Sequence, residues 1–325
     1  MSFDLEIRGV SLQRGQFRLL LDVTLLGLLL LLRTYFKDLW PPTTQRGFFC
    51  DDESLMYPYR ESTVSSLMLH CISIYFPMMA LLILETSRAW QGSRQYWYVY
   101  NTLRWFIVGY SAQSLLKDMS KNVIGRLRPH FFEVCRPQLP DNGFCSDEVN
   151  RSGGVYHTVY RCRTDLSGAT EEMLADIHVS FPSGHSSNTF YGLLFLVLHL
   201  ERIRWPLPGS LLRPVCQLLC VCLASFVGLS RVMDYKHHSS DVVAGSLLGA
   251  AIAFAAVRAA GLDERLRLAS GRGQNANTSP AKPAAPTPVA MAASAGGSAG
   301  APVEEDPGAK QLPHDLCQVT CHSSN

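Results

Sequence analysis

The sequence predicts an all-α integral membrane protein with six transmembrane helices. Charged residues make up only 17% of the 325 residues, against about 25% in ordinary soluble domains. Several long apolar stretches lie between residues 17 and 260, and about 20 mostly apolar residues are enough for a helix to cross a bilayer. Residues 270–325 contain almost no apolar stretch. We therefore expect a membrane domain followed by a polar tail, and not a water-soluble globule.

Six apolar stretches are the expected spans, and they cover residues 17–32, 65–84, 103–116, 186–200, 211–229 and 241–259. The first is nearly all leucine but carries Asp22, and Pro77 predicts a kink in the second. The third is weak, because Ser111, Gln113 and Ser114 interrupt it, and the fourth is short. These two could instead be buried helices of a soluble core. We favour complete crossings, because the other four stretches are strong and a bilayer tolerates no exposed irregular backbone.

The distribution of Lys and Arg predicts that both termini lie in the cytoplasm. With this orientation the four cytoplasmic segments hold 13 Lys and Arg residues and the two short opposite segments hold 6, a bias in the direction of the positive-inside rule. The long opposite segment 120–180 holds 7 more and is discounted, because long loops contribute little to the orientation. Residues 1–16 are then a cytoplasmic N-terminal tail without the features of a cleaved signal peptide, and residues 17–260 are the six-span domain. Residues 261–325 are expected to be a disordered cytoplasmic tail, because Ala, Pro, Gly and Ser supply 20 of the 25 residues from 279 to 303.

The long loop between the third and fourth spans is expected on the exoplasmic side. Asn150 opens an Asn-Arg-Ser sequon there and is predicted to be glycosylated, whereas the sequon at Asn277 lies in the cytoplasmic tail and should stay unmodified. The same side holds four cysteines that could form disulfides, namely Cys50, Cys135, Cys145 and Cys162. Four cysteines allow three pairings, and the sequence does not choose among them. The other cysteines are expected to be free thiols.

Three polar clusters lie at the exoplasmic ends of the spans. In the first, Lys121 and Arg128 are seven residues apart, so they share a face if the helix of the third span continues. Two cations on one face suit a ligand with two negative charges. The alternative is a basic patch that binds lipid headgroups at the membrane surface.

The second cluster, Pro182-Ser183-Gly184-His185, directly precedes the fourth span. Gly184 lets the backbone approach a ligand closely, and the unpaired amides of a first helical turn attract anions. Ser183 adds a hydroxyl donor, and His185 can carry a proton near neutral pH. The alternative is a helix N-cap, which is compatible with a binding site.

The third cluster joins the fifth and sixth spans and contains Ser230-Arg231, His237 and Asp241. His237 and Asp241 are one helical turn apart, so the carboxylate can hold one ring nitrogen and leave the other as a base or nucleophile. The alternative is a capped helix start, for which Asp241 is well suited.

Taken together, the clusters predict phosphoryl transfer through histidine without a metal or cofactor. Charged groups so close to hydrocarbon are costly and usually functional. The set offers cations for a phosphate, a polarised histidine and a second histidine for the leaving group, but lacks the several carboxylates that a magnesium or zinc site needs. A formal net charge of +2 gives no reason to expect a nucleic-acid partner.

The three clusters resemble the signature of the lipid phosphate phosphatases, the type-2 phosphatidic acid phosphatase superfamily. That signature is Lys, six residues and Arg-Pro; then Pro-Ser-Gly-His; then Ser-Arg, five residues, His, three residues and Asp. The sequence departs nowhere from it, with matches at Lys121, Arg128-Pro129, Pro182-Ser183-Gly184-His185, Ser230-Arg231, His237 and Asp241. Residues 46–50, followed by 57–59, also look like the first outer loop of the animal branch. The resemblance covers roughly residues 17–260.

The resemblance implies a role for each matching residue. His237 would be the nucleophile that forms a phosphohistidine, and Asp241 would orient it. His185 would protonate the departing alkoxide. His238 breaks the spacing to Asp241 and is the less favoured nucleophile. The phosphate oxygens would be held by Lys121, Arg128, Ser183, the amide of Gly184, and Arg231.

These features predict an integral-membrane phosphatase for phosphatidate, lysophosphatidate, sphingosine 1-phosphate or ceramide 1-phosphate, and do not choose among these lipids. The alternatives are a catalytically silent scaffold or lipid-binding relative, and a transporter, which would need more mid-span ionisable residues than Asp22. The expected location is the plasma membrane with an extracellular site, or else an internal membrane with a luminal site. Gly245 and Gly249 permit close helix packing within one chain or between chains, which leaves homo- and hetero-oligomers open.

Overall fold

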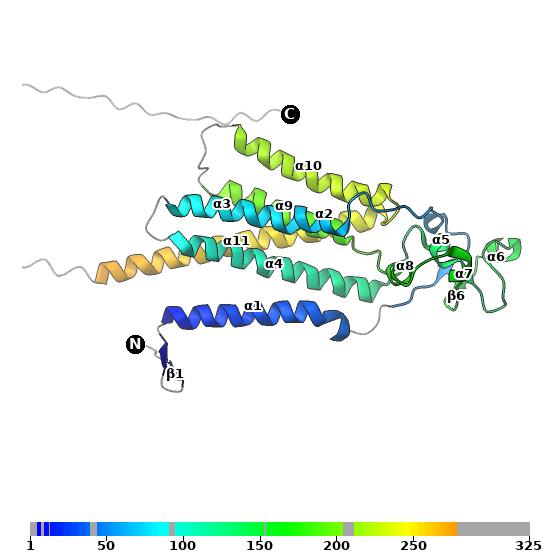
Figure 1. The fold of residues 1–325 in the computed structure, drawn as a ribbon, viewed down its shortest axis with the longest axis horizontal. Helices are drawn as coiled ribbons and strands as arrows, with labels where there is room; N and C mark the ends of the chain where they lie inside the picture. The colour runs from blue at the N-terminus through cyan, green and yellow to red at the C-terminus, as the bar shows by residue number, and fades with distance from the viewer. Residues whose placement is uncertain are drawn as a thin grey trace, which may run out of the picture. The chain divides into compact units, whose positions relative to one another are not determined.

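The computed structural model describes residues 5–7, 10–12, 14–39, 44–90, 95–152, 154–203 and 211–277. Long helices dominate these residues (Figure 1). The expected spans correspond to α1 (Arg14–Leu39), the segment from α2 (Ser66–His70) to α3 (Phe76–Trp90), α4 (Gln95–Ile124), α9 (Gly184–Arg202), α10 (Leu212–Met233) and α11 (Ser239–Asn277). Each expected stretch is helical, except that the second and fifth begin one residue before their helix, and the other four helices extend beyond the stretch at both ends.

Four of these helical segments are long and apolar enough to cross a membrane: residues 19–36, 66–88, 212–233 and 239–266. The others, α4 and α9, are the two that the sequence marks as weak. Their polar residues meet inside the bundle, where the Ser187 hydroxyl donates to the Gln113 side chain (2.6 Å) and the Gln113 amide donates to Asn188 (2.6 Å). The polar interruptions thus reflect helix–helix contacts, and the count of six spans remains a prediction.

Helix α9 forms the centre of the bundle and packs against α11, α10 and α4. Its Tyr191, Leu193 and Phe195 are fully buried. A side chain at Gly245 of α11 would collide with the backbone of Ser183, the N-cap of α9, and one at Gly249 would collide with the backbone of Ser187 within α9. The two glycines therefore serve close packing within the chain, one of the two uses that their spacing permits.

The second helical segment is not one regular helix. It consists of α2 (Ser66–His70), a π-helical turn η2 (Cys71–Tyr75) and α3 (Phe76–Trp90). The irregular turn ends at Tyr75, two residues before Pro77, whose missing amide hydrogen and ring are incompatible with an ordinary helical turn. The kink predicted at Pro77 stays a prediction, and the feature that the structure has next to it is this π-helical turn.

Ion pairs join the helices at the end opposite to the three clusters. Arg104 of α4 contacts Asp22 of α1 and Asp263 of α11. The buried Glu85 of α3 lies 2.6 Å from His199 of α9. Asp22 thus has a fixed cationic partner, as a charge in an apolar helix requires.

The segments outside the long helices fold into a small cap at one end of the bundle (Figure 1). Its 3₁₀-helix η1 covers Glu53–Leu55, and its helices are α5 (Phe131–Cys135), α6 (Glu148–Ser152), α7 (Thr164–Ser167) and α8 (Glu171–Asp176). Antiparallel pairs form between β3 (Phe48–Phe49) and β5 (Tyr156–His157), and between β4 (Pro137–Gln138) and β6 (Arg161–Cys162). A further pair, β1 (Leu5–Ile7) and β2 (Val10–Leu12), precedes α1.

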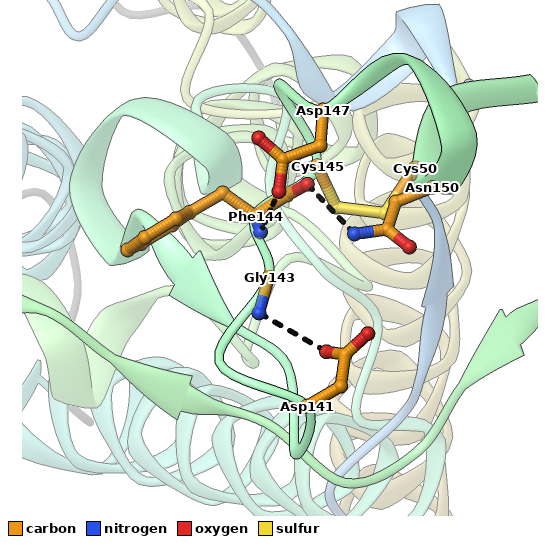
Figure 2. The surroundings of a disulfide bond; sticks show 7 residues. All are labelled: Cys50, Asp141, Gly143, Phe144, Cys145, Asp147 and Asn150. Atoms are coloured by element: carbon orange, nitrogen blue, oxygen red, sulfur yellow. Dashed lines mark hydrogen bonds between the residues drawn. A yellow bond between two sulfur atoms is a disulfide. The ribbon is translucent and has the colours of Figure 1, made fainter.

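Two disulfides hold the cap together, Cys50–Cys145 and Cys135–Cys162. They select one of the three pairings that the sequence left open. Figure 2 shows the loop beside the first disulfide, where the Asn150 side chain donates to the Phe144 carbonyl at 3.1 Å. The cap core beneath is aromatic, with Phe48 and Phe131 at 5.0 Å between ring centroids.

The expectation that disorder begins at residue 261 is wrong for residues 261–277. Helix α11 continues to Asn277, and Glu264 in this extension pairs with Arg202 at 3.1 Å. The apolar pattern ends near residue 260, but interhelical ion pairs continue beyond it. The rest of the expected tail, with Cys317 and Cys321, lies outside the described residues.

Candidate active site

The fold brings the three clusters together at the cap end of the bundle. Backbone hydrogen bonds join them directly: the Ser183 amide donates to the Asp241 carbonyl at 3.0 Å, and the Arg128 amide donates to the Ile177 carbonyl at 2.9 Å. The Ser180 amide also donates to the Arg126 carbonyl at 3.0 Å. Segments that are distant in sequence therefore form one continuous site.

The first cluster leaves helix α4 at Gly125. This residue has a φ of +56°, and a side chain there would collide with the Thr44 carbonyl. Only glycine adopts this conformation at low cost. The turn ends α4 at Ile124. Because the helix does not continue to Arg128, Lys121 and Arg128 do not lie on one helical face, and Arg126 and Arg128 follow in a non-helical segment.

The second cluster is a capped helix start, as its alternative interpretation predicts. The Ser183 hydroxyl accepts the Ser186 amide at 3.5 Å and the Ser186 hydroxyl at 3.1 Å. A Cβ at Gly184 would lie 3.8 Å from the Lys121 ammonium nitrogen. The cap and the anion site coincide, because the first amides of α9 lie next to a cation of the first cluster.

His237 is held by a backbone carbonyl. Its Nδ1 atom lies 2.7 Å from the Ser180 carbonyl oxygen, whereas the nearer Asp241 oxygen is 3.9 Å away. A carbonyl only accepts hydrogen bonds, so Nδ1 carries the proton and Nε2 carries the lone pair. The expected direct hydrogen bond from His237 to the Asp241 carboxylate is not present, and the Ser180 carbonyl accepts from Nδ1 in its place.

Asp241 instead organises its surroundings. The carboxylate is fully buried and accepts hydrogen bonds from Arg126 (2.6 Å) and the Ser180 hydroxyl (2.6 Å). It also accepts the backbone amide of His238 at 3.1 Å. Ser180 therefore links the two side chains, because its hydroxyl donates to Asp241 and its carbonyl oxygen contacts His237 Nδ1. The sequence analysis assigned no role to Arg126 or Ser180, although Gly125 marks the turn that delivers Arg126.

The two expected phosphate-binding arginines are buried and partly satisfied. Arg128 donates to Asp176 at 2.6 Å. Arg231 donates to Asp234 at 3.4 Å and to the Ser62 hydroxyl at 3.1 Å. Asp176 and Asp234 were not predicted as partners.

In each of the three clusters, one buried side-chain nitrogen atom has no hydrogen-bond partner among the described residues. They are Nε2 of His185, Nε of Arg128 and Nε of Arg231. Buried donors normally have partners, so unpaired ones point to a ligand. The donor set of two guanidinium groups and an imidazole suits an oxyanion such as phosphate.

The electrostatics favour a neutral His237. Burial lowers its pKa well below the ordinary value, and the neighbouring cations Arg128 and Lys121 lower it further, while Asp241 opposes the shift. The imidazole is therefore uncharged at neutral pH and its Nε2 lone pair is available as a nucleophile. Burial, together with Arg128 and Arg231, also lowers the pKa of Lys236 to about 8.

The carboxylates around the site are engaged by arginine. Asp241 pairs with Arg126, as Asp176 does with Arg128. Among the described residues, no group of three or more His, Cys, Asp or Glu side chains is arranged to hold a metal ion. Asp234, the nearest spare carboxylate in the sequence, also has partners here.

Comparisons with known proteins agree with this geometry. The family model described as the PAP2 superfamily matches residues 102–264, which contain all three clusters. A putative phosphatidate phosphatase of Drosophila melanogaster is 41% identical over 226 residues, 63% of this chain and 58% of that protein. The match thus spans less than two thirds of the fly protein.

Two mammalian relatives are covered more fully. Phospholipid phosphatase 1 of Rattus norvegicus is 38% identical over 222 residues, 66% of this chain and 74% of the rat protein. Phospholipid phosphatase 2 of Mus musculus is 38% identical over 223 residues, 66% of this chain and 75% of the mouse protein. No solved structure matches the chain. The family model covers half of the chain and the cluster geometry agrees with it, so the chain belongs to the lipid phosphate phosphatases of the PAP2 superfamily.

Proposed function

We propose that this chain is an integral-membrane phosphatase for lipid phosphate monoesters, namely phosphatidate, lysophosphatidate, sphingosine 1-phosphate or ceramide 1-phosphate. The observation that carries the proposal is the set of unpaired buried nitrogens on Arg128, Arg231 and His185. They share a site with a histidine whose Nδ1 is fixed on a carbonyl. The names of the relatives support the same class of reaction.

In the first step, His237 Nε2 attacks the phosphorus atom of the lipid. A nitrogen–phosphorus bond forms, the bond between phosphorus and the lipid oxygen breaks, and His185 gives a proton to the departing alkoxide. A bound phosphate dianion favours the protonated form of His185 that this step needs. The Ser180 carbonyl stabilises the positive charge that develops on the His237 ring, because Nδ1–H donates to it.

In the second step, water attacks the phosphohistidine and His185 accepts its proton. The nitrogen–phosphorus bond breaks and inorganic phosphate is released. Arg128, Arg231 and Lys121, with the Ser183 hydroxyl and the Gly184 amide, hold the phosphate oxygens in both steps. Phosphoryl transfer has a loose transition state, so this positioning and charge stabilisation supplies most of the rate.

With the six spans predicted from the sequence, the site would face the exoplasmic side, and the plasma membrane with an extracellular site is the proposed location. The two disulfides of the cap support this side, because disulfides persist in oxidising compartments. An internal membrane with a luminal site satisfies the same observations. Labelling of an introduced cap cysteine with an impermeant reagent on intact cells distinguishes the two.

The experiment that tests the function measures phosphate release from lysophosphatidate by membranes that contain the wild-type chain, with EDTA present. We expect turnover in EDTA, inhibition by vanadate, which resembles the transferring phosphoryl group, and no turnover by His237→Ala. Loss of activity in EDTA with recovery in magnesium would contradict the histidine mechanism. Wild-type protein that binds these lipids but hydrolyses none of them would be the silent relative.

A further inference from the structure

A short segment of the first outer loop, residues 57–64, crosses all three clusters; we call it the strap. The Tyr57 amide donates to the Pro129 carbonyl at 3.1 Å, which ties the strap to the first cluster. At its other end, the strap lies beside the second cluster: burial lowers the pKa of His185 to about 3, and the nearby Val64 backbone opposes this shift. The strap therefore belongs to the site by contact, although it carries none of the signature residues.

Its contact with the third cluster is the most specific. Thr63 donates to Asp234 twice, through its backbone amide at 2.8 Å and its hydroxyl at 2.7 Å. Asp234 in turn accepts Arg231 Nη1 at 3.4 Å, and Arg231 Nη2 donates to the Ser62 hydroxyl at 3.1 Å. Both terminal nitrogens of the arginine thus have partners that the strap supplies or holds.

Only the third nitrogen of Arg231, Nε, is buried without a partner. A guanidinium group is planar and rigid. Fixing Nη1 on Asp234 and Nη2 on Ser62 therefore fixes the direction of Nε as well. This matters because Arg231 is 2% exposed and little water is available to replace a lost partner.

Aromatic contacts anchor the strap on the loop that carries His237. Tyr57 stacks on Tyr235 with 4.6 Å between ring centroids. The Arg60 guanidinium lies over the same Tyr235 ring, 4.7 Å from its centroid. The Lys236 ammonium lies 3.5 Å above the Tyr59 ring. The strap thus contacts the 234–237 turn through aromatic rings as well as through the hydrogen bonds from Thr63 to Asp234, which lies in that turn.

We propose that Ser62 and Thr63 are positioning residues for catalysis, which set Arg231 so that its Nε is directed at the phosphate. This role rests on the proposed phosphatase function. Removal of either hydroxyl should lower phosphate binding and transition-state stabilisation together, because one misplaced donor affects both states. Misplacement of a reacting or binding group by about 1 Å can cost about a hundredfold in rate.

The test uses full-length chain in detergent–lipid micelles with lysophosphatidate as substrate. Thr63→Val removes a hydroxyl at nearly constant volume, Thr63→Ser restores it, and Ser62→Ala alters an exposed residue and is expected to fold. The matched control is Thr102→Val, which removes a hydroxyl bond of 3.0 Å to the buried carboxylate of Glu85. Thr102 lies on α4, 19 residues before Lys121, or about 28 Å along the helix.

We expect kcat/KM to fall about tenfold in Thr63→Val and in Ser62→Ala, and about a hundredfold in the double variant. The inhibition constant of vanadate should rise in parallel. Thr63→Ser should recover most of the activity, and Thr102→Val should keep the wild-type KM and vanadate inhibition.

A purely structural role for the strap would reduce the yield of active protein but leave KM and vanadate inhibition unchanged, and that result would overturn the positioning role. Equal kinetics for wild type and the double variant would also overturn it. An inactive wild-type chain would instead contradict the phosphatase function itself, so the two failures are distinguishable.

Discussion

Removal of Arg126 tests how Asp241 acts on the nucleophile. Asp241 is fully buried and Arg126 is the one Lys or Arg side chain within 4.0 Å of it among the described residues. The variant Arg126→Ala leaves this carboxylate with the Ser180 hydroxyl and His238 as donors. We expect the site to lose stability and His237 to lose its fixed orientation, because Ser180 links the two.

The magnitude follows from burial. Removal of one partner from a fully buried ion pair costs about 3–5 kcal/mol. The Arg126 side chain is 31% exposed, so water can replace part of the interaction, and a value near that of a charged hydrogen bond, about 2 kcal/mol, is expected. For a domain of this size that corresponds to a fall of about 5 °C in Tm. Asp241→Asn in the same background should restore part of it, because no unpaired charge then remains.

Thermal unfolding of the wild type, both single variants and the double variant in detergent gives the coupling energy directly. We expect coupling of about 1–2 kcal/mol and a fall in kcat of at least tenfold for Arg126→Ala, with a smaller change in KM. Additive effects on Tm would refute the pairing as a source of stability. Normal kcat in Arg126→Ala, with Asp241→Asn inactive, would show that Asp241 acts on His237 without Arg126.

Three further outcomes are expected. His237→Ala should abolish turnover while His238→Ala keeps a measurable part of it, and the reverse result in a phosphate-release assay would move the nucleophile by one residue. Burial lowers the pKa of His130 to about 4, so protonation of His130 favours the unfolded state and stability is lost as the pH falls below about 6.5. Between pH 7.5 and pH 5, His130→Gln should lose about 2 kcal/mol less of its free energy of unfolding than the wild type. Equal losses of Tm in both proteins would refute this. Glycosidase should shift the wild type but not Asn150→Gln, whereas a shift that depends on Asn277 would invert the topology.

The helices could be predicted from the sequence because their apolar stretches are long. The boundaries could not, because they depend on contacts between helices. Helix α11 continues past its apolar stretch, where Glu264 meets Arg202. The polar residues of α4 and α9 look like interruptions until Gln113 is seen to bond Ser187 of the neighbouring helix.

The signature residues could be predicted because order and spacing identify them, but their partners could not. Arg126, Ser180 and Asp176 come from segments with no regular periodicity, and only the folded cap brings them to the site. The Asp241–His237 spacing predicted a direct contact, yet the backbone places a carbonyl nearer to the ring. Spacing within one helix says nothing of a competing acceptor from another segment. The disulfide pairing could not be predicted either, because it depends on which segments of the cap the fold brings together.

The carboxylates beside this anion site have a physical explanation. A buried guanidinium group without a partner is strongly destabilising, and a carboxylate partner removes most of that cost. Asp176 and Asp234 each pair with one terminal nitrogen of an arginine, and the Nε atom of both arginines stays unpaired.

The pairing thus fixes each guanidinium group and leaves one donor, Nε, for the phosphate of the proposed mechanism. Arg126 differs, since its Nη1 atom donates to both Ser240 (2.7 Å) and Asp241 (2.6 Å). The three arginines therefore differ in their hydrogen-bond partners, and this difference is consistent with phosphate binding by Arg128 and Arg231 and a supporting role for Arg126 in the proposed mechanism.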